Sequence, residues 1–73
     1  MAKTIQNTIR RLRFDHKEMT QQELADKIGV TRQTVNAIEL NKYSPSLEVA
    51  FRIAEVFGVP LDQVFQYGPR SKS

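Results

Sequence analysis

Residues 20–39, TQQELADKIGVTRQTVNAIE, constrain the fold most strongly, because they contain start and stop signals for two short helices. Thr20 and Glu23 have the spacing of a capping box, which marks the beginning of a helix. Gly29 stands where the end of a helix favours a left-handed residue, and Thr31 can cap a second helix. The sequence therefore predicts two helices joined by a tight turn, over residues 21–28 and 32–40.

The two helices separate apolar from polar side chains. Leu24, Ala25 and Ile28 share one face of the first helix, and Val35 and Ile38 share one face of the second. Two short helices around a glycine turn are typical of a helix-turn-helix, whose second helix enters the major groove of DNA. The outward side chains of the second helix are rich in donors that suit base edges and phosphates: Arg32, Gln33 and Asn36. The alternative is an exposed polar face that touches only phosphates.

Further helices are predicted on both sides of this pair. Asn7 is a plausible cap for a helix that runs to about residue 16 or 17 and buries Ile9 and Leu12. The loop of residues 40–46 contains Pro45, which should end any preceding helix. A fourth helix is expected from about residue 46 to residue 57. Its wide apolar stripe predicts the back wall of the core: Leu47, Ala50, Phe51, Ile53, Ala54 and Phe57.

A last short helical turn is expected in LDQVF, residues 61–65, after Gly58 has ended the fourth helix. The expected fold is therefore all-α, with five helices. A chain of 73 residues suffices for one domain. The domain is predicted over residues 7–66, with a lead-in at 1–6 and a mobile basic tail at 67–73.

The composition argues against several classes of protein. The chain has no cysteine and one histidine, so nucleophilic catalysis and thiolate or zinc sites have little material. Asp15 and His16 are interpreted as a solvated pair, and no glycine-rich phosphate loop occurs. We expect no enzyme activity, no metal, no cofactor and no small-molecule substrate.

Charge and hydropathy leave DNA as a possible partner. The net charge of +3 and the pI near 9.6 permit a polyanion but do not require one. The apolar runs are too short for a membrane span, and the N-terminus lacks the apolar segment of a signal peptide. The expected location is therefore the cytoplasm.

The order of these elements resembles the lambda-repressor-like (Cro/C1-type, or xenobiotic-response-element) helix-turn-helix family. The resemblance is carried by TQQELADKIGVTRQTVNAIE and by NKYSPSLEVAFRIAEVFGVPLDQVF, and it extends over about residues 9–65. One departure is an apparent extra residue in FDHKEM, which is expected to alter only the turn between the first two helices. The resemblance implies a compact five-helix DNA-binding domain.

The resemblance implies a role for each matching residue, although each could also be an ordinary exposed polar side chain. Arg32, Gln33 and Asn36 match positions that read bases. Thr31 is first of all a cap, and Thr34 could approach a thymine methyl group or the backbone. The expected contacts with the DNA backbone are Gln21, Thr31, Thr34, Lys42, Tyr43 and Ser44. Arg13 and Glu39 match a structural ion pair between the first and third helices.

The ending FQYGP resembles a subgroup of small homodimers of the cytolysin-regulator type, in which both chain ends add a little sheet. This resemblance implies a β-pairing of residues 4–6 with residues 65–67. It also implies a homodimer. The expected dimer interface consists of Ile5, Val64, Phe65 and Tyr67.

Two functions follow from this interpretation. The first is a sequence-specific DNA-binding transcriptional regulator, by default a repressor, that binds a palindromic operator as a homodimer. The second is an antitoxin-like interaction module that binds a protein partner and binds DNA only as part of that complex. Capture of a stoichiometric protein partner would distinguish the second from the first.

Overall fold

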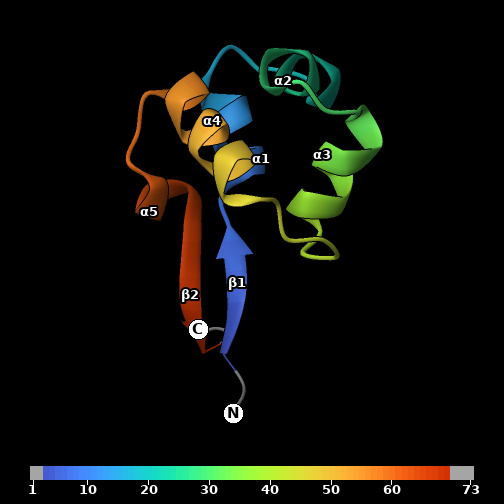
Figure 1. Cartoon of the computed structure of the whole chain (residues 1–73). Coiled ribbons are helices and arrows are strands. Elements are labelled where there is room, and N and C mark those ends of the chain that lie inside the picture. Colours follow the sequence, from blue (N-terminus) through green and yellow to red (C-terminus); the bar gives the residue numbers. More distant parts are fainter. Residues whose placement is uncertain (1–2, 70–73) are drawn as a thin grey trace.

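The computed structural model describes residues 3–69 and has the predicted five helices, from which a two-stranded antiparallel sheet projects (Figure 1). The elements are, in order, β1 Lys3–Asn7, α1 Ile9–Asp15, α2 Gln21–Ile28, α3 Arg32–Glu39, α4 Leu47–Phe57, α5 Leu61–Val64 and β2 Phe65–Pro69.

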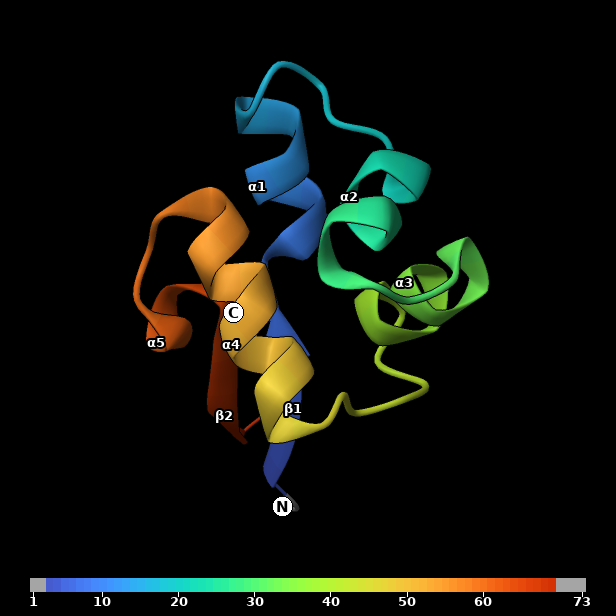
Figure 2. The ribbon, with the colours of Figure 1, turned by 45° about the horizontal axis from the view of Figure 1, so that its top comes forward.

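Every helix contributes to one apolar core. The fully buried side chains include Ile9 of α1, Leu24 of α2 and Val64 of α5. α2 packs against both α3 and α4, and α4 also packs against α5. In Figure 2, α4 lies between α5 on one side and the pair α2–α3 on the other. The two helices predicted from residues 20–39 therefore rest on α1 and α4 for the burial of their apolar faces.

The prediction for α4 is wrong at two positions. Ala50, Ile53 and Phe57 are buried as expected. Leu47 and Phe51, however, are 68% and 54% exposed. They lie four residues apart and therefore share a face of α4, which the described part of the chain leaves largely uncovered. The apolar stripe thus forms a core wall on one side and an exposed apolar surface on the other.

Local caps explain where the central helices begin and end. The hydroxyl of Thr20 accepts a hydrogen bond from the backbone N–H of Glu23 at 3.0 Å, and the Glu23 carboxylate accepts one from the Thr20 N–H at 2.8 Å. α2 ends at Gly29, whose φ of +79° is unfavourable for residues with a Cβ atom. Leu40 follows α3 as its C-cap, so this helix is one residue shorter than predicted.

The first helix begins later than the sequence suggests. Asn7 is the last residue of β1, and Thr8 is the N-cap of α1. The side chain of Asn7 still serves the helix start, because its Oδ1 accepts a hydrogen bond from the N–H of Ile9 at 3.1 Å. The predicted cap is therefore displaced by one residue, and the lead-in contains the β-strand that the resemblance implies for residues 4–6.

The sheet pairs the two chain ends that the resemblance implies. Ile5 lies opposite Tyr67 and Gln6 opposite Gln66, and the pairing continues from Lys3 with Pro69 to Asn7 with Phe65. Phe65 therefore belongs to β2 and not to the last helical turn. Residues 67–69 are likewise in β2 and not in the predicted tail, whereas residues 70–73 lie outside the described residues.

The turn after α1 contains two consecutive left-handed residues. Lys17 has φ +60° and Glu18 has φ +55°, in the stretch where the sequence has an apparent extra residue. A residue with a Cβ atom pays roughly 1–2 kcal/mol for this conformation, whereas glycine adopts it readily. Lys17 and Glu18 thus place backbone strain in this turn.

We expect Lys17→Gly to raise the free energy of unfolding by about 0.5 kcal/mol, because the relief of strain exceeds the added entropy of the unfolded chain. Urea denaturation measures the change. Lys27→Gly is the control, because Lys27 lies inside α2, where glycine costs about 1 kcal/mol. Destabilisation by both variants would show that Lys17 is not strained.

Candidate nucleic-acid interface

The turn between α2 and α3 determines which face of α3 is exposed. The hydroxyl of Thr31 accepts a hydrogen bond from the N–H of Thr34 at 3.2 Å and lies 3.0 Å from the Thr34 hydroxyl. Val35 and Ile38 are then buried against the core. The opposite face is exposed and consists of Arg32, Gln33 and Asn36, the three side chains predicted to read bases.

An ion pair that is largely shielded from water joins α1 to α3. The Nε atom of Arg13 donates to Glu39 Oε2 at 2.6 Å, and its Nη2 atom donates to Oε1 at 3.0 Å. The side chains are only 15% and 7% exposed. Arg13 also donates to the carbonyl of Met19 at 2.8 Å, which satisfies a further nitrogen. The resemblance to the lambda-repressor-like family implies an ion pair between these two residues.

Gln21 connects this ion pair to the exposed face of α3. Its Nε2 atom donates to Glu39 Oε1 at 3.2 Å and to Asn36 Oδ1 at 3.1 Å. Because a carboxylate only accepts hydrogen bonds, the amino group of Gln21 must face Glu39. The same amino group then requires the oxygen of Asn36, so that the Nδ2 donors of Asn36 point elsewhere.

These contacts have a consequence for the predicted role of Gln21. An amide nitrogen carries two hydrogens, and both are engaged within the protein. Gln21 can therefore meet a phosphate through its backbone N–H at the start of α2, or by giving up one of these bonds. A depression of about 350 Å³ lies beside this network, lined by Arg10, Arg13, Gln21, Asn36, Glu39 and Leu40.

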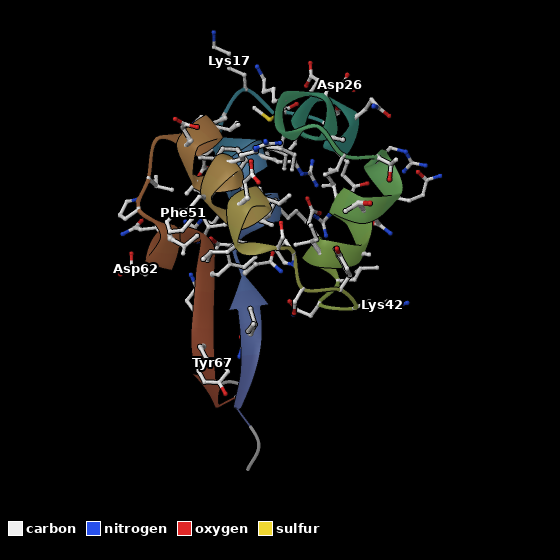
Figure 3. All side chains as sticks on the ribbon, viewed as in Figure 1. Lys17, Asp26, Lys42, Phe51, Asp62 and Tyr67 are labelled. Atoms are coloured by element: carbon white, nitrogen blue, oxygen red, sulfur yellow. The ribbon has the colours of Figure 1, made fainter. Side chains whose placement is uncertain are left out.

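The loop after α3 presents the other predicted backbone contacts. Lys42, Tyr43 and Ser44 are all exposed. Figure 3 shows Lys42 extending away from the helices. Neither Lys42 nor Arg32 has an ion-pair partner within residues 3–69. The exposed side of α3 and the following loop therefore carry positive charge that the described part of the chain does not neutralise.

The residues predicted for a dimer interface are not equally accessible. Ile5 and Tyr67 are 42% and 70% exposed, and Phe65 is half-buried. In Figure 3 Tyr67 lies on β2, near the end of the sheet that is remote from the helices. Val64 is fully buried in the core, so its assignment to an interface is wrong.

An apolar groove lies next to these residues and was not predicted. It has a volume of about 410 Å³ and extends from the sheet to the start of α4, lined by Ile5, Ser44, Pro45, Leu47, Ala50, Leu61, Phe65, Gln66 and Tyr67. Leu47 was assigned to the core because the sequence shows that α4 is apolar but not which elements cover it. Its position in the first turn, directly after the cap at Ser46, was the available signal that it could lie at the edge.

His16, the only histidine of the chain, is held by contacts within the protein. The Nδ1 atom of His16 lies 2.8 Å from the carbonyl of Leu12, and its ring meets that of Phe57 edge-on at 5.0 Å. Within residues 3–69, no three His, Asp or Glu side chains are grouped so that they could hold a metal ion. No helix in this part of the chain is long and apolar enough to cross a membrane.

Comparisons with known proteins agree with this geometry. The helix-turn-helix family model matches residues 9–64. An HTH-type transcriptional regulator of Methanocaldococcus jannaschii is 55% identical over 49 residues, which cover 67% of this chain and 74% of that protein. The cryptic phage CTXphi transcriptional repressor of Vibrio cholerae is 38% identical over 56 residues, which cover 77% of this chain but 50% of the repressor.

A solved structure extends the likeness to three dimensions. The crystal structure of a candidate DNA-binding protein from Bacteroides fragilis has a TM-score of 0.74 and 27% sequence identity. The match covers 86% of this chain and 100% of that one. The chain therefore belongs to the Cro/C1-type helix-turn-helix family of DNA-binding transcriptional regulators.

Proposed function

We propose that this regulator is a repressor that binds a palindromic operator as a homodimer, with α3 in the major groove. The observation that carries this proposal is the exposed polar face of α3. The Arg13–Glu39 ion pair fixes this helix to α1. Such a rigid support favours base reading, because a reading side chain must be placed accurately. The similarity to a phage transcriptional repressor supports repression.

In this proposal Arg32, Gln33 and Asn36 contact base edges. Arginine can grip guanine, and glutamine or asparagine can pair with adenine, each good pair contributing about 1–3 kcal/mol of discrimination. Asn36 is oriented by Gln21, which accounts for one of its oxygen lone pairs. Its outward donors suit the acceptors at the major-groove edges of purines.

The DNA backbone is contacted on both sides of α3. Lys42, Tyr43 and Ser44 form one set of contacts, because they are exposed and follow the helix directly. Gln21 contributes its backbone N–H at the start of α2, where helix N-termini favour phosphate. Thr31 and Thr34 lie at the start of α3, where their hydroxyl groups add contacts with the DNA backbone. These contacts set the register on the DNA, and the base contacts select the sequence.

A second copy of the chain occupies the apolar groove in this proposal. Ile5, Leu47 and Tyr67 are exposed beside one another around it, and burial of apolar surface is the main favourable term in association. A two-fold axis at this surface would present two copies of α3 to half-sites about 34–36 Å apart. The cytoplasm, where the genome of a bacterium or an archaeon lies, is the corresponding site of action.

Selection of bound sequences from random DNA tests the proposal. Wild-type protein should enrich a palindrome, and Gln33→Ala or Asn36→Ala should relax one position of each half-site, with roughly 5- to 150-fold less discrimination there. Gln22→Ala is the control, because Gln22 is exposed on α2 and bonds to Asp26. It should leave the selected sequence unchanged. Failure of the wild type to enrich any sequence would contradict the proposal and favour an interaction module.

A further inference from the structure

Asn7 lies at a junction of three segments. It is the last residue of β1, where it pairs with Phe65 of β2. Its Oδ1 atom accepts from the N–H of Ile9 at the start of α1 at 3.1 Å. Its Nδ2 atom crosses to the end of α3 and donates to the carbonyl of Ile38 and to Asn41 Oδ1, both at 2.9 Å. One amide thus ties the sheet to α1 and to α3.

The contact with Asn41 reaches the loop that carries Lys42. Asn41 is left-handed, with φ +61°, a conformation that asparagine tolerates better than most residues but still at a cost. Two backbone bonds then close the end of α3, from the N–H of Asn41 to Ile38 at 3.0 Å and from the N–H of Lys42 to Ala37 at 2.9 Å. The hydrogen bond from Asn7 therefore stabilises Asn41, the left-handed residue at which the chain turns after α3.

We propose that Asn7 is a positioning residue that determines which spacing of half-sites the dimer accepts. The inference rests on the proposed function, in which the sheet and its groove meet a second copy while α3 reads DNA. The separation of the two α3 helices then depends on how firmly each is held to its own sheet. Asn7 contributes two short hydrogen bonds to the connection between the sheet and α3. It therefore affects operator choice without touching DNA.

Thr8 offers a matched control. Its hydroxyl donates to the carbonyl of Gln63 at 2.6 Å, so it ties the same junction to α5 instead of α3. Thr8→Val keeps the shape of the side chain and removes this bond. Both Thr8→Val and Asn7→Ala should reduce stability, but only Asn7→Ala should loosen α3 relative to the sheet. A change seen in Asn7→Ala alone is therefore not a general effect of destabilisation.

The experiment measures the affinity of the dimer for the selected operator and for versions with one base pair added or removed between the half-sites. Asn7→Ala should bind the best operator roughly tenfold more weakly, since two protomers each lose neutral hydrogen bonds. It should also discriminate less between spacings than the wild type does. Thr8→Val should keep the wild-type discrimination. Wild-type discrimination by Asn7→Ala would overturn the proposal.

Hydrogen exchange of the DNA-free protein provides a second measurement. The amides of Asn41 and Lys42 should exchange faster in Asn7→Ala than in the wild type. Asn41→Gly keeps the left-handed backbone but removes one of the hydrogen bonds of Asn7, so it should accelerate exchange by a smaller factor. Unchanged exchange in Asn7→Ala would overturn the positioning role. If the wild type selects no operator, the proposed function fails separately, and exchange still decides whether Asn7 holds this loop.

Discussion

Glu39→Ala is expected to lower the free energy of unfolding by about 3–5 kcal/mol. The substitution leaves the guanidinium of Arg13 without its carboxylate in a site where the arginine side chain is 15% exposed. It also removes an acceptor of Gln21. At roughly 0.05–0.15 kcal/mol per residue, a domain of 73 residues has a total stability of about 4–11 kcal/mol, so this loss is a large part of it and the melting temperature should fall by more than about 10 °C. Thermal denaturation followed by circular dichroism measures this change.

Glu48→Ala is the control for this prediction. Glu48 forms an ion pair with Arg52 at the same 2.6 Å distance, but the two side chains are 74% and 49% exposed. Loss of this pair should cost less than about 1 kcal/mol, because water screens it and solvates the remaining charge. Unchanged melting of Glu39→Ala together with a strong shift in DNA affinity would instead mean that Glu39 acts at the DNA.

Leu47→Glu is expected to convert the proposed dimer to monomers and to weaken operator binding at least about hundredfold. Leu47 is 68% exposed at the apolar groove, so a charge there should be tolerated in the monomer. In a two-fold interface the charge is introduced twice, into surface that dimerisation removes from water. A hundredfold loss of affinity corresponds to about 2.7 kcal/mol, which is within the range of about 2 kcal/mol and upwards that hot-spot residues near the centre of an interface contribute.

Sedimentation equilibrium measures the assembly, and a DNA titration measures the affinity. Phe14→Glu is the control for assembly, because Phe14 is 66% exposed on α1 and does not line the groove. This variant should sediment as the wild type does. If Leu47→Glu stays dimeric, the second copy binds elsewhere. If the wild type is monomeric at operator-saturating concentrations, the homodimer itself is wrong.

Local signals predict the helices that carry the site. A hydroxyl three residues before an available N–H marks the starts of α2, α3 and α4, at Thr20, Thr31 and Ser46. Gly29 and Gly58 mark the ends of α2 and α4 by their left-handed backbone. Each of these signals depends on residues within one turn of the chain, which is why the sequence alone sufficed.

Burial of apolar side chains required the tertiary structure. The pattern of α4 shows that Leu47 and Phe51 are apolar neighbours, but their exposure depends on where α5 and the sheet lie. The opposite error concerns Val64, which was assigned to the exposed dimer interface but is buried in the core, because α5 directs its side chain inward. Both errors concern residues at or beside the proposed interface, because an exposed apolar side chain and a buried one look alike in sequence.

The polar contacts of the site also could not be predicted from local sequence signals. The Arg13–Glu39 pair was expected only because the chain resembles a family that has one. The bonds of Gln21 to Asn36 and of Asn7 to Ile38 join residues 15 and 31 positions apart. Neither spacing has a periodicity that a sequence pattern could reveal. These contacts follow from how the helices pack, and they decide how the exposed side chains are oriented.

The pairing of β1 with β2 has a consequence for the order of folding. Lys3 lies opposite Pro69, so β1 cannot pair until residues 65–69, more than 55 positions further along the chain, have been made. Contacts between distant residues also form late because closing a long loop costs entropy. α2 and α3 contain their own caps and can form earlier. We therefore expect a chain interrupted before residue 65 to form α2 and α3 without the sheet, so that the proposed pairing of two copies requires residues 65–69.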